Sequence, residues 1–147
     1  MPDTQTDVPP PIQPPPPIAP PASSGLPEPE KHARLWNMLC HLSALTGYIG
    51  VPFGNIWMPL LIWQIKKHDV PSVEIHGKAA FNFQLTVVLA IFASGILAVI
   101  GAFFCLGHIL MLLPLAILVT GCVYAVINGI KANDGEPIHY PYAIEFF

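Results

Sequence analysis

Residues 79–130 read AAFNFQLTVVLAIFASGILAVIGAFFCLGHILMLLPLAILVTGCVYAVINGI, and none of these 52 residues is Asp, Glu, Lys or Arg. A bilayer core about 30 Å thick takes about 20 helical residues to cross. This uncharged stretch is therefore long enough for two membrane spans joined by a short turn. We expect the turn at Cys105–His108.

A second uncharged stretch, residues 35–65, has 31 residues and allows two interpretations. One long helix would have to include Gly47, Gly50, Pro52, Gly54 and Pro59. Proline costs a helix interior about 3 kcal/mol and glycine about 1 kcal/mol. The other interpretation is a short hairpin with arms near residues 29–46 and 53–67, and we favour it because the break then falls among these residues.

The basic residues indicate the orientation. With two hairpins all six fall on one face of the membrane, which the positive-inside rule makes cytoplasmic. They are Lys31, Arg34, Lys66, Lys67, Lys78 and Lys131. A single first span would divide them between the two faces. We therefore predict an all-α membrane protein with four transmembrane helices as two hairpins, the first of them short, and with both termini cytoplasmic.

The chain before residue 30 has a different composition, with 12 of the 18 prolines. It lacks the basic start and apolar core of a signal peptide, and its prolines prevent a helix. We predict a disordered proline-rich cytoplasmic tail over residues 1–29, followed by a four-helix membrane domain over residues 30–147. The tail is interpreted as a spacer, with a docking peptide for an aromatic groove as the alternative.

Composition argues against several classes of function. A net charge of −3 gives no basic surface for nucleic acid, and 53% hydrophobic with 10% charged residues is unlike a soluble domain. No nucleophile–base pair, paired carboxylates, metal-ligand spacing or phosphate loop stands out. We therefore expect no enzyme, no catalytic residue, no metal and no cofactor. Cys40, Cys105 and Cys122 are interpreted as small apolar residues.

Four amide side chains lie two to four residues inside the basic residues, one in each expected helix. They are Asn37, Gln64, Asn82 and Asn128. The hairpin topology places them in one layer about 3–6 Å below the charged face. In one interpretation each amide is separately solvated by water at the headgroup boundary. In the other, the four form a ring of hydrogen bonds or the floor of a cytoplasm-facing cavity. His41 lies one turn deeper than Asn37, and is interpreted as a packed histidine or a binding residue.

Small residues recur at every fourth position in the last two expected helices. One row is Ala90, Ser94, Ala98 and Ala102, and the other is Gly121, Ala125 and Gly129. Such rows let membrane helices approach closely. We expect them to pack these two helices against each other.

Three stretches resemble a bacterial family of small multi-pass membrane proteins whose domain has no assigned function. They are NIWMPLLIW at residues 55–63, HGKAAFNFQ at 76–84 and YPY at 140–142. That family is in turn similar to the twenty-kilodalton Tic subunit of the chloroplast import machinery. The resemblance covers residues 31–147 and implies a helical protein of the bacterial cytoplasmic membrane, with no catalytic residue to carry over.

The expected function is an accessory or structural role in a membrane assembly, for which the resemblance implies protein translocation. The expected partners are the lipid bilayer and either another membrane protein or further copies of the chain. The alternative function is a small channel or carrier with a polar cavity open to the cytoplasm.

Overall fold

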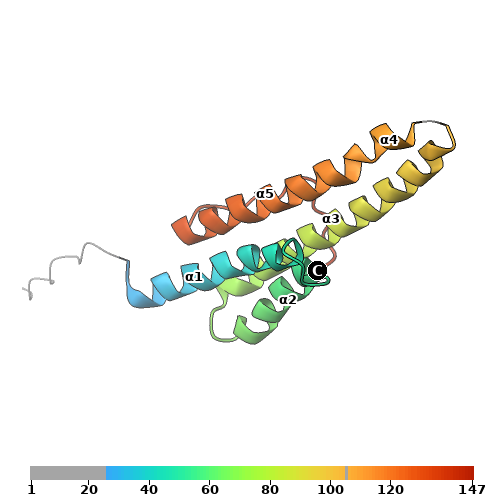
Figure 1. Cartoon of the computed structure of the whole chain (residues 1–147). Helices are drawn as coiled ribbons and strands as arrows, with labels where there is room; N and C mark the ends of the chain where they lie inside the picture. The colour runs from blue at the N-terminus through green and yellow to red at the C-terminus, as the bar shows by residue number, and fades with distance from the viewer. Residues whose placement is uncertain (1–25, 105) are drawn as a thin grey trace, which may run out of the picture.

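The computed structural model describes residues 26–104 and 106–147, and in this part of the chain every regular element is helical. Most of the proline-rich tail predicted over residues 1–29 lies outside the described residues, namely residues 1–25. Cys105 lies outside them as well. The elements in chain order are α1 (Glu28–Leu42), the 3-10 helix η1 (Ser43–Gly47), α2 (Gly54–Lys66), α3 (Ser72–Ala102), α4 (Gly107–Leu110) and α5 (Leu112–Asp134) (Figure 1).

The first hairpin consists of α1 with η1, and of α2. The chain reverses between Gly47 and Gly54, where the hairpin interpretation expects the break. Gly50 has a φ of 107° and Phe53 a φ of 54°, so two residues in this turn adopt backbone conformations that a continuous helix does not contain. Pro59 is accommodated inside α2, where it is buried.

The second hairpin is much longer. α3 has 31 residues and therefore extends about 46 Å, and the return arm Gly107–Asp134 has 28. The turn comes slightly earlier than expected, since α4 already begins at Gly107. A Cβ on Gly107 would lie 2.7 Å from Cα of Ala102, so a glycine here lets the two arms meet closely.

The two hairpins pack side by side over only part of their length. α1 contacts α5, α3 and α2, and α2 contacts η1 and α3. The first hairpin covers the half of the second that lies near the N-terminus of α3, and the α3–α4 turn projects well beyond it (Figure 1). Near the other end Cys40, Val70 and Val73 form an apolar core beneath the α2–α3 loop.

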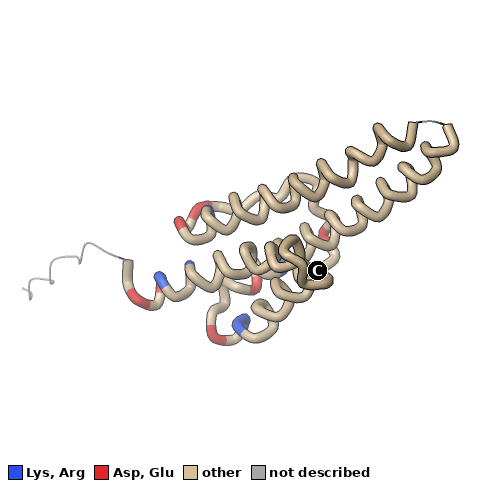
Figure 2. Tube along the Cα trace, in the orientation of Figure 1, with Lys and Arg blue, Asp and Glu red and all other residues tan. Residues whose placement is uncertain are grey.

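The charged residues gather at one end of the bundle (Figure 2). They lie on the start of α1, on the end of α2 and the α2–α3 loop, on the start of α3, and on the end of α5 and just after it. Glu145 lies at the inner edge of this charged end, because its neighbours bond to Asn82 and Thr86, which follow Lys78 on α3. It belongs to the final stretch of the chain, residues 135–147. These residues, called the C-terminal segment below, turn at Gly135 (φ 75°) and run back along α5 and α3 (Figure 1).

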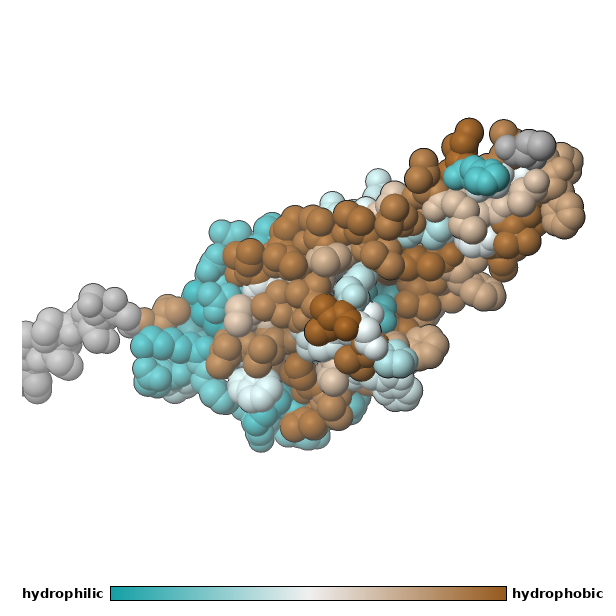
Figure 3. Space-filling model, in the orientation of Figure 1, coloured by the Kyte–Doolittle hydropathy of each residue, from teal (hydrophilic) through white to brown (hydrophobic). Residues whose placement is uncertain are grey.

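The projecting part of the second hairpin is coated with apolar side chains (Figure 3). Phe92, Phe103 and Ile109 are 71%, 84% and 69% exposed. Soluble monomers rarely expose a continuous apolar surface of this extent. α3 and the Gly107–Asp134 arm are thus long and apolar enough to cross a membrane, and their exposure differs from that of a buried helix in a soluble protein.

Candidate functional site

Three polar side chains from separate parts of the chain meet in the bundle, and two of them, His76 and Tyr140, are partly exposed. His41 of α1 is completely buried, and both of its ring nitrogens are hydrogen-bonded. Nδ1 lies 2.7 Å from the hydroxyl of Tyr140, in the C-terminal segment. Nε2 lies 3.0 Å from Nδ1 of His76, in α3. These residues, called the His–Tyr cluster below, therefore join α1, α3 and the C-terminal segment.

The hydrogen bonds of the His–Tyr cluster form a chain that is satisfied when all three groups are neutral. If the Tyr140 hydroxyl donates to Nδ1 of His41, then Nε2 of His41 donates to His76; the opposite direction satisfies both bonds equally well. Burial raises the pKa of Tyr140, with the nearby Cys40 and Tyr48 acting in the same direction. The phenol therefore keeps its proton at neutral pH, and it remains available as a donor.

A second buried polar layer lies two turns further along α3. The side chain of Gln84 is completely buried, and its Oε1 accepts hydrogen bonds from the hydroxyl of Tyr48, at 3.2 Å, and from Nδ2 of Asn55, at 3.5 Å. Its Nε2 is buried and finds no hydrogen-bond partner among the described residues. This layer ties the turn of the first hairpin to α3.

Gly121 makes room for this layer. A Cβ at Gly121 would lie 2.6 Å from the hydroxyl oxygen of Tyr48 and 3.0 Å from a methyl group of Val87. A glycine in a helix interior usually costs stability. Here it allows α5 to approach both the first hairpin and α3.

Asparagines hold the C-terminal segment against the bundle. Asn128 of α5 accepts the backbone N–H of His139 at 2.8 Å and donates to its carbonyl oxygen at 3.0 Å. Asn82 of α3 accepts the N–H of Phe146 and donates to the main-chain oxygen of Phe147. The hydroxyl of Thr86 accepts the N–H of Ile144 at 3.0 Å. The segment is therefore fixed by side chains of two helices.

The four amides expected to form one layer have separate partners. Asn82 and Asn128 are buried and hold the C-terminal segment, and Asn37 is buried and accepts a hydrogen bond from the hydroxyl of Ser72. Gln64 is exposed and accepts from Lys67. Asn82 also lines a cavity beside α3, which is described below.

The two rows of small residues do not simply face each other. On α5, a Cβ at Gly129 would meet Leu42 of α1 at 2.8 Å, and Ala125 is completely buried. On α3, Ser94 and Ala98 are buried, Ala90 is partly exposed and Ala102 is exposed. The α5 row therefore contacts the first hairpin as well as α3, because α1 packs along the same stretch of α5.

The partners of His41 were not singled out from the sequence. His76 and Tyr140 lie 35 and 99 residues away from it, so no local spacing connects them. Gln84, in the second layer, lies 36 residues from Tyr48 and 29 from Asn55. One feature of the sequence could have pointed to these residues. The three stretches that carry the family resemblance contain all of them: Asn55, His76, Gln84 and Tyr140. Those stretches converge on the two buried polar layers. Over residues 26–104 and 106–147, no group of three His, Cys, Asp or Glu side chains is placed to hold a metal ion.

Residues 32–147 match the model of the magnetosome magnetite crystal formation protein family, MamF/MmsF. The chain belongs to this family. The match begins inside α1 and includes the rest of both hairpins and the C-terminal segment, and therefore every residue of the two buried layers. No curated protein and no solved structure matches the chain.

Membership of the magnetosome family corrects the resemblance drawn from the sequence. The stretches at residues 55–63, 76–84 and 140–142 were assigned to a family similar to the chloroplast Tic subunit, whereas the family model names a different family. The short motifs indicated a small helical membrane protein but did not specify its family. The translocation role implied by that resemblance is withdrawn with it.

Proposed function

We propose that this chain is a multi-pass protein of a magnetosome membrane that assists the formation of magnetite crystals as an accessory or structural component, without catalysing a reaction itself. The family match over residues 32–147 carries this proposal. The exposed apolar surface of the second hairpin supports insertion in a membrane. The same surface is available to lipid, to another membrane protein or to a second copy of the chain.

A deletion in the host bacterium tests this function. Removing the chain should change the mean size or number of the magnetite crystals seen by electron microscopy, and the wild-type chain supplied in trans should restore both. A chain with Gly95→Ala, supplied in trans in the same way, is the control for a harmless substitution, because a Cβ there meets nothing within 4 Å. Crystals unchanged by the deletion would contradict the proposal. A pronounced ion flux through vesicles containing the purified protein would favour the channel or carrier alternative.

For the topology, we propose that both termini and the α2–α3 loop are cytoplasmic, in the bacterial cytoplasmic membrane or a membrane derived from it. The charged ends of all the long helices support this orientation. The 13 residues of α2 cover only about 20 Å, against a core of about 30 Å. We therefore propose that the first hairpin enters the membrane from the cytoplasmic side and turns within it. At the base of this turn Gly47 packs against Asn55 and Gly54 packs against Thr46, whereas the tip at residues 49–53 is exposed.

Cysteine labelling in sealed vesicles of known orientation tests this topology. In a chain without its native cysteines, His108→Cys should react with an impermeant thiol reagent only from the non-cytoplasmic side, and His68→Cys only from the cytoplasmic side. Ile49→Cys, at a side chain 80% exposed in the bundle, should react poorly from both sides because lipid surrounds it. Reaction of His68→Cys from the non-cytoplasmic side would refute the two-hairpin orientation. Rapid reaction of Ile49→Cys from that side would show that the first hairpin crosses fully.

A further inference from the structure

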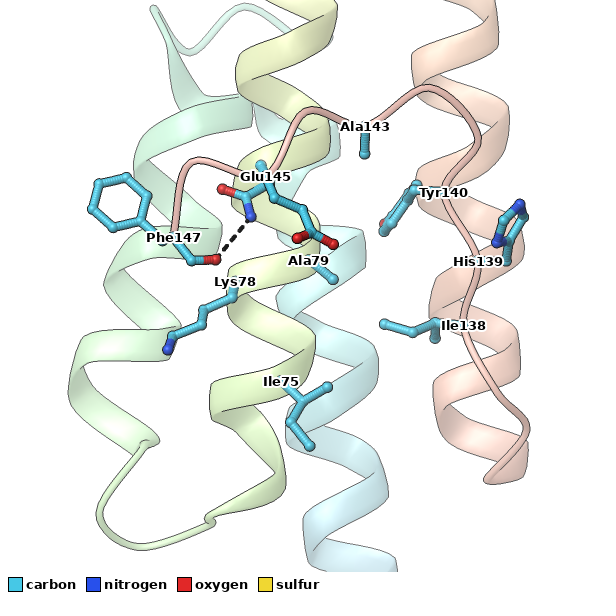
Figure 4. A pocket seen from close by; sticks show the side chains of 10 residues that line it. Ile75, Lys78, Ala79, Ile138, His139, Tyr140, Ala143, Glu145 and Phe147 are labelled. Carbon is cyan, nitrogen blue, oxygen red and sulfur yellow. Dashed lines mark hydrogen bonds between the residues drawn. The ribbon is translucent and has the colours of Figure 1, made fainter.

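A cavity of about 540 Å³ lies between α3 and the C-terminal segment, at the charged end of the bundle. Its α3 wall is formed by Ile75, Lys78, Ala79 and Asn82, and the other wall belongs to the C-terminal segment (Figure 4). Its volume is within the range of sites for small organic molecules. Neither buried polar layer requires such a cavity.

The cavity is lined by one cation and one carboxylate that do not pair with each other. Nζ of Lys78 lies 2.9 Å from Glu74, one turn back on α3. Glu145 makes no ion pair with any residue in the described part of the chain. Residues 1–25 contain no Lys or Arg that could supply one. The carboxylate of Glu145 is exposed and has no ion pair within the described residues, so it is accessible to a cation from outside the chain.

The position of Glu145 places this carboxylate at the edge of the membrane. The neighbouring residues Ile144 and Phe146 are bonded to Thr86 and Asn82, which follow Lys78 on α3. The side chain of Glu145 extends from the segment toward Tyr140 and Ala79 (Figure 4). Lys78 is the last charge on α3 before the uncharged 52 residues. In the proposed topology the carboxylate therefore lies near the level of the lipid headgroups, which carry charged groups of their own.

We propose that this cavity binds the headgroup of one phospholipid that carries both a phosphate and a primary ammonium group, as phosphatidylethanolamine does. The ammonium group pairs with Glu145 and the phosphate approaches Lys78, both of which line the cavity. Tyr140 and Phe147 provide aromatic walls, and an ammonium group is attracted to an aromatic face. Ile75 and Ile138 provide apolar surface for the glycerol and the first part of the acyl chains.

This site rests on the membrane insertion included in the proposed function, but it does not depend on a role in crystal formation. If the deletion left the crystals unchanged, the lipid selectivity described next could still be measured. If the selectivity were absent, the crystal phenotype would be unaffected. The two proposals therefore fail separately.

Thermal unfolding of the purified full chain in detergent tests the site. Added phosphatidylethanolamine should raise the melting temperature more than phosphatidylcholine or phosphatidylglycerol does at equal concentration. Glu145→Gln should abolish this difference, because the amide keeps the shape and loses the charge. Glu136→Gln, at an exposed position of the same segment that does not line the cavity, should retain it.

Further measurements distinguish a lipid from a soluble amine as the source of the ammonium group. Free ethanolamine or phosphoethanolamine should not reproduce the shift; an equal shift would assign the site to soluble amines instead of a lipid. An undiminished preference for phosphatidylethanolamine in Glu145→Gln, or no preference in the wild type, would overturn the proposal. If Glu145→Gln does not fold, native mass spectrometry of the wild type decides: retention of phosphatidylethanolamine over phosphatidylglycerol supports the site, and equal retention overturns it.

Discussion

Replacing His41 by leucine should lower the free energy of unfolding by about 2–6 kcal/mol, since each buried polar group left without its partner costs about 1–3 kcal/mol. Two groups lose their partner in this variant, the hydroxyl of Tyr140 and Nδ1 of His76. Leucine is similar enough to histidine in size that the loss is due mainly to the hydrogen bonds. An unfolding titration with a denaturing detergent in mixed micelles measures it.

His108→Leu is the matched control for this variant. His108 lies exposed at the start of α4, far from the His–Tyr cluster, so the same substitution should change the unfolding free energy little. The loss of the Tyr140 contact should also loosen the C-terminal segment, and amide hydrogen exchange should rise in residues 138–147 of the His41 variant. Equal stability of the two variants would mean that the His–Tyr cluster does not hold the bundle together.

A methyl group added at Gly77 should also destabilise the protein strongly. A Cβ there would lie 2.5 Å from Cβ and 2.8 Å from Cγ of Trp63, at the root of that side chain. A rotation of Trp63 cannot remove this contact, so α2 and α3 must separate. Overpacking of this kind costs about 1–3 kcal/mol, occasionally more. Gly77→Ala should therefore lower the melting temperature in detergent.

Gly95→Ala tests whether the effect comes from the contact or from the loss of a glycine. Both glycines lie in the interior of α3, but a Cβ at Gly95 meets nothing within 4 Å. Alanine is favoured over glycine in a helix by up to about 1 kcal/mol, so this control should be unchanged or more stable. Opposite signs for the two substitutions are the expected result. A gain in stability at both positions would show that α2 and α3 are not in close contact at Gly77.

The candidate site could be anticipated only in part. Asn82 and Asn128 were predicted as site residues because an amide side chain is costly in an apolar stretch, and both are buried. Gln64 satisfied the same criterion and is exposed, because the spacing from a charge gives the depth of a residue in a helix but not the face it occupies. His76 lies beside Lys78, among other polar residues at the start of α3, and nothing in its local sequence distinguishes it.

The amino-acid sequence by itself determined which segments are helical, where the first hairpin breaks and which end of the bundle carries charge. These features follow from local chemistry, namely runs without charge, helix-breaking residues and the cost of charge in an apolar medium. Only the tertiary structure decided that His41 meets His76 and Tyr140, that asparagines hold the C-terminal segment, and that Glu145 lines a cavity with Lys78. Such contacts depend on how helices rotate and pack against one another, and packing is a property of surfaces from distant parts of the chain.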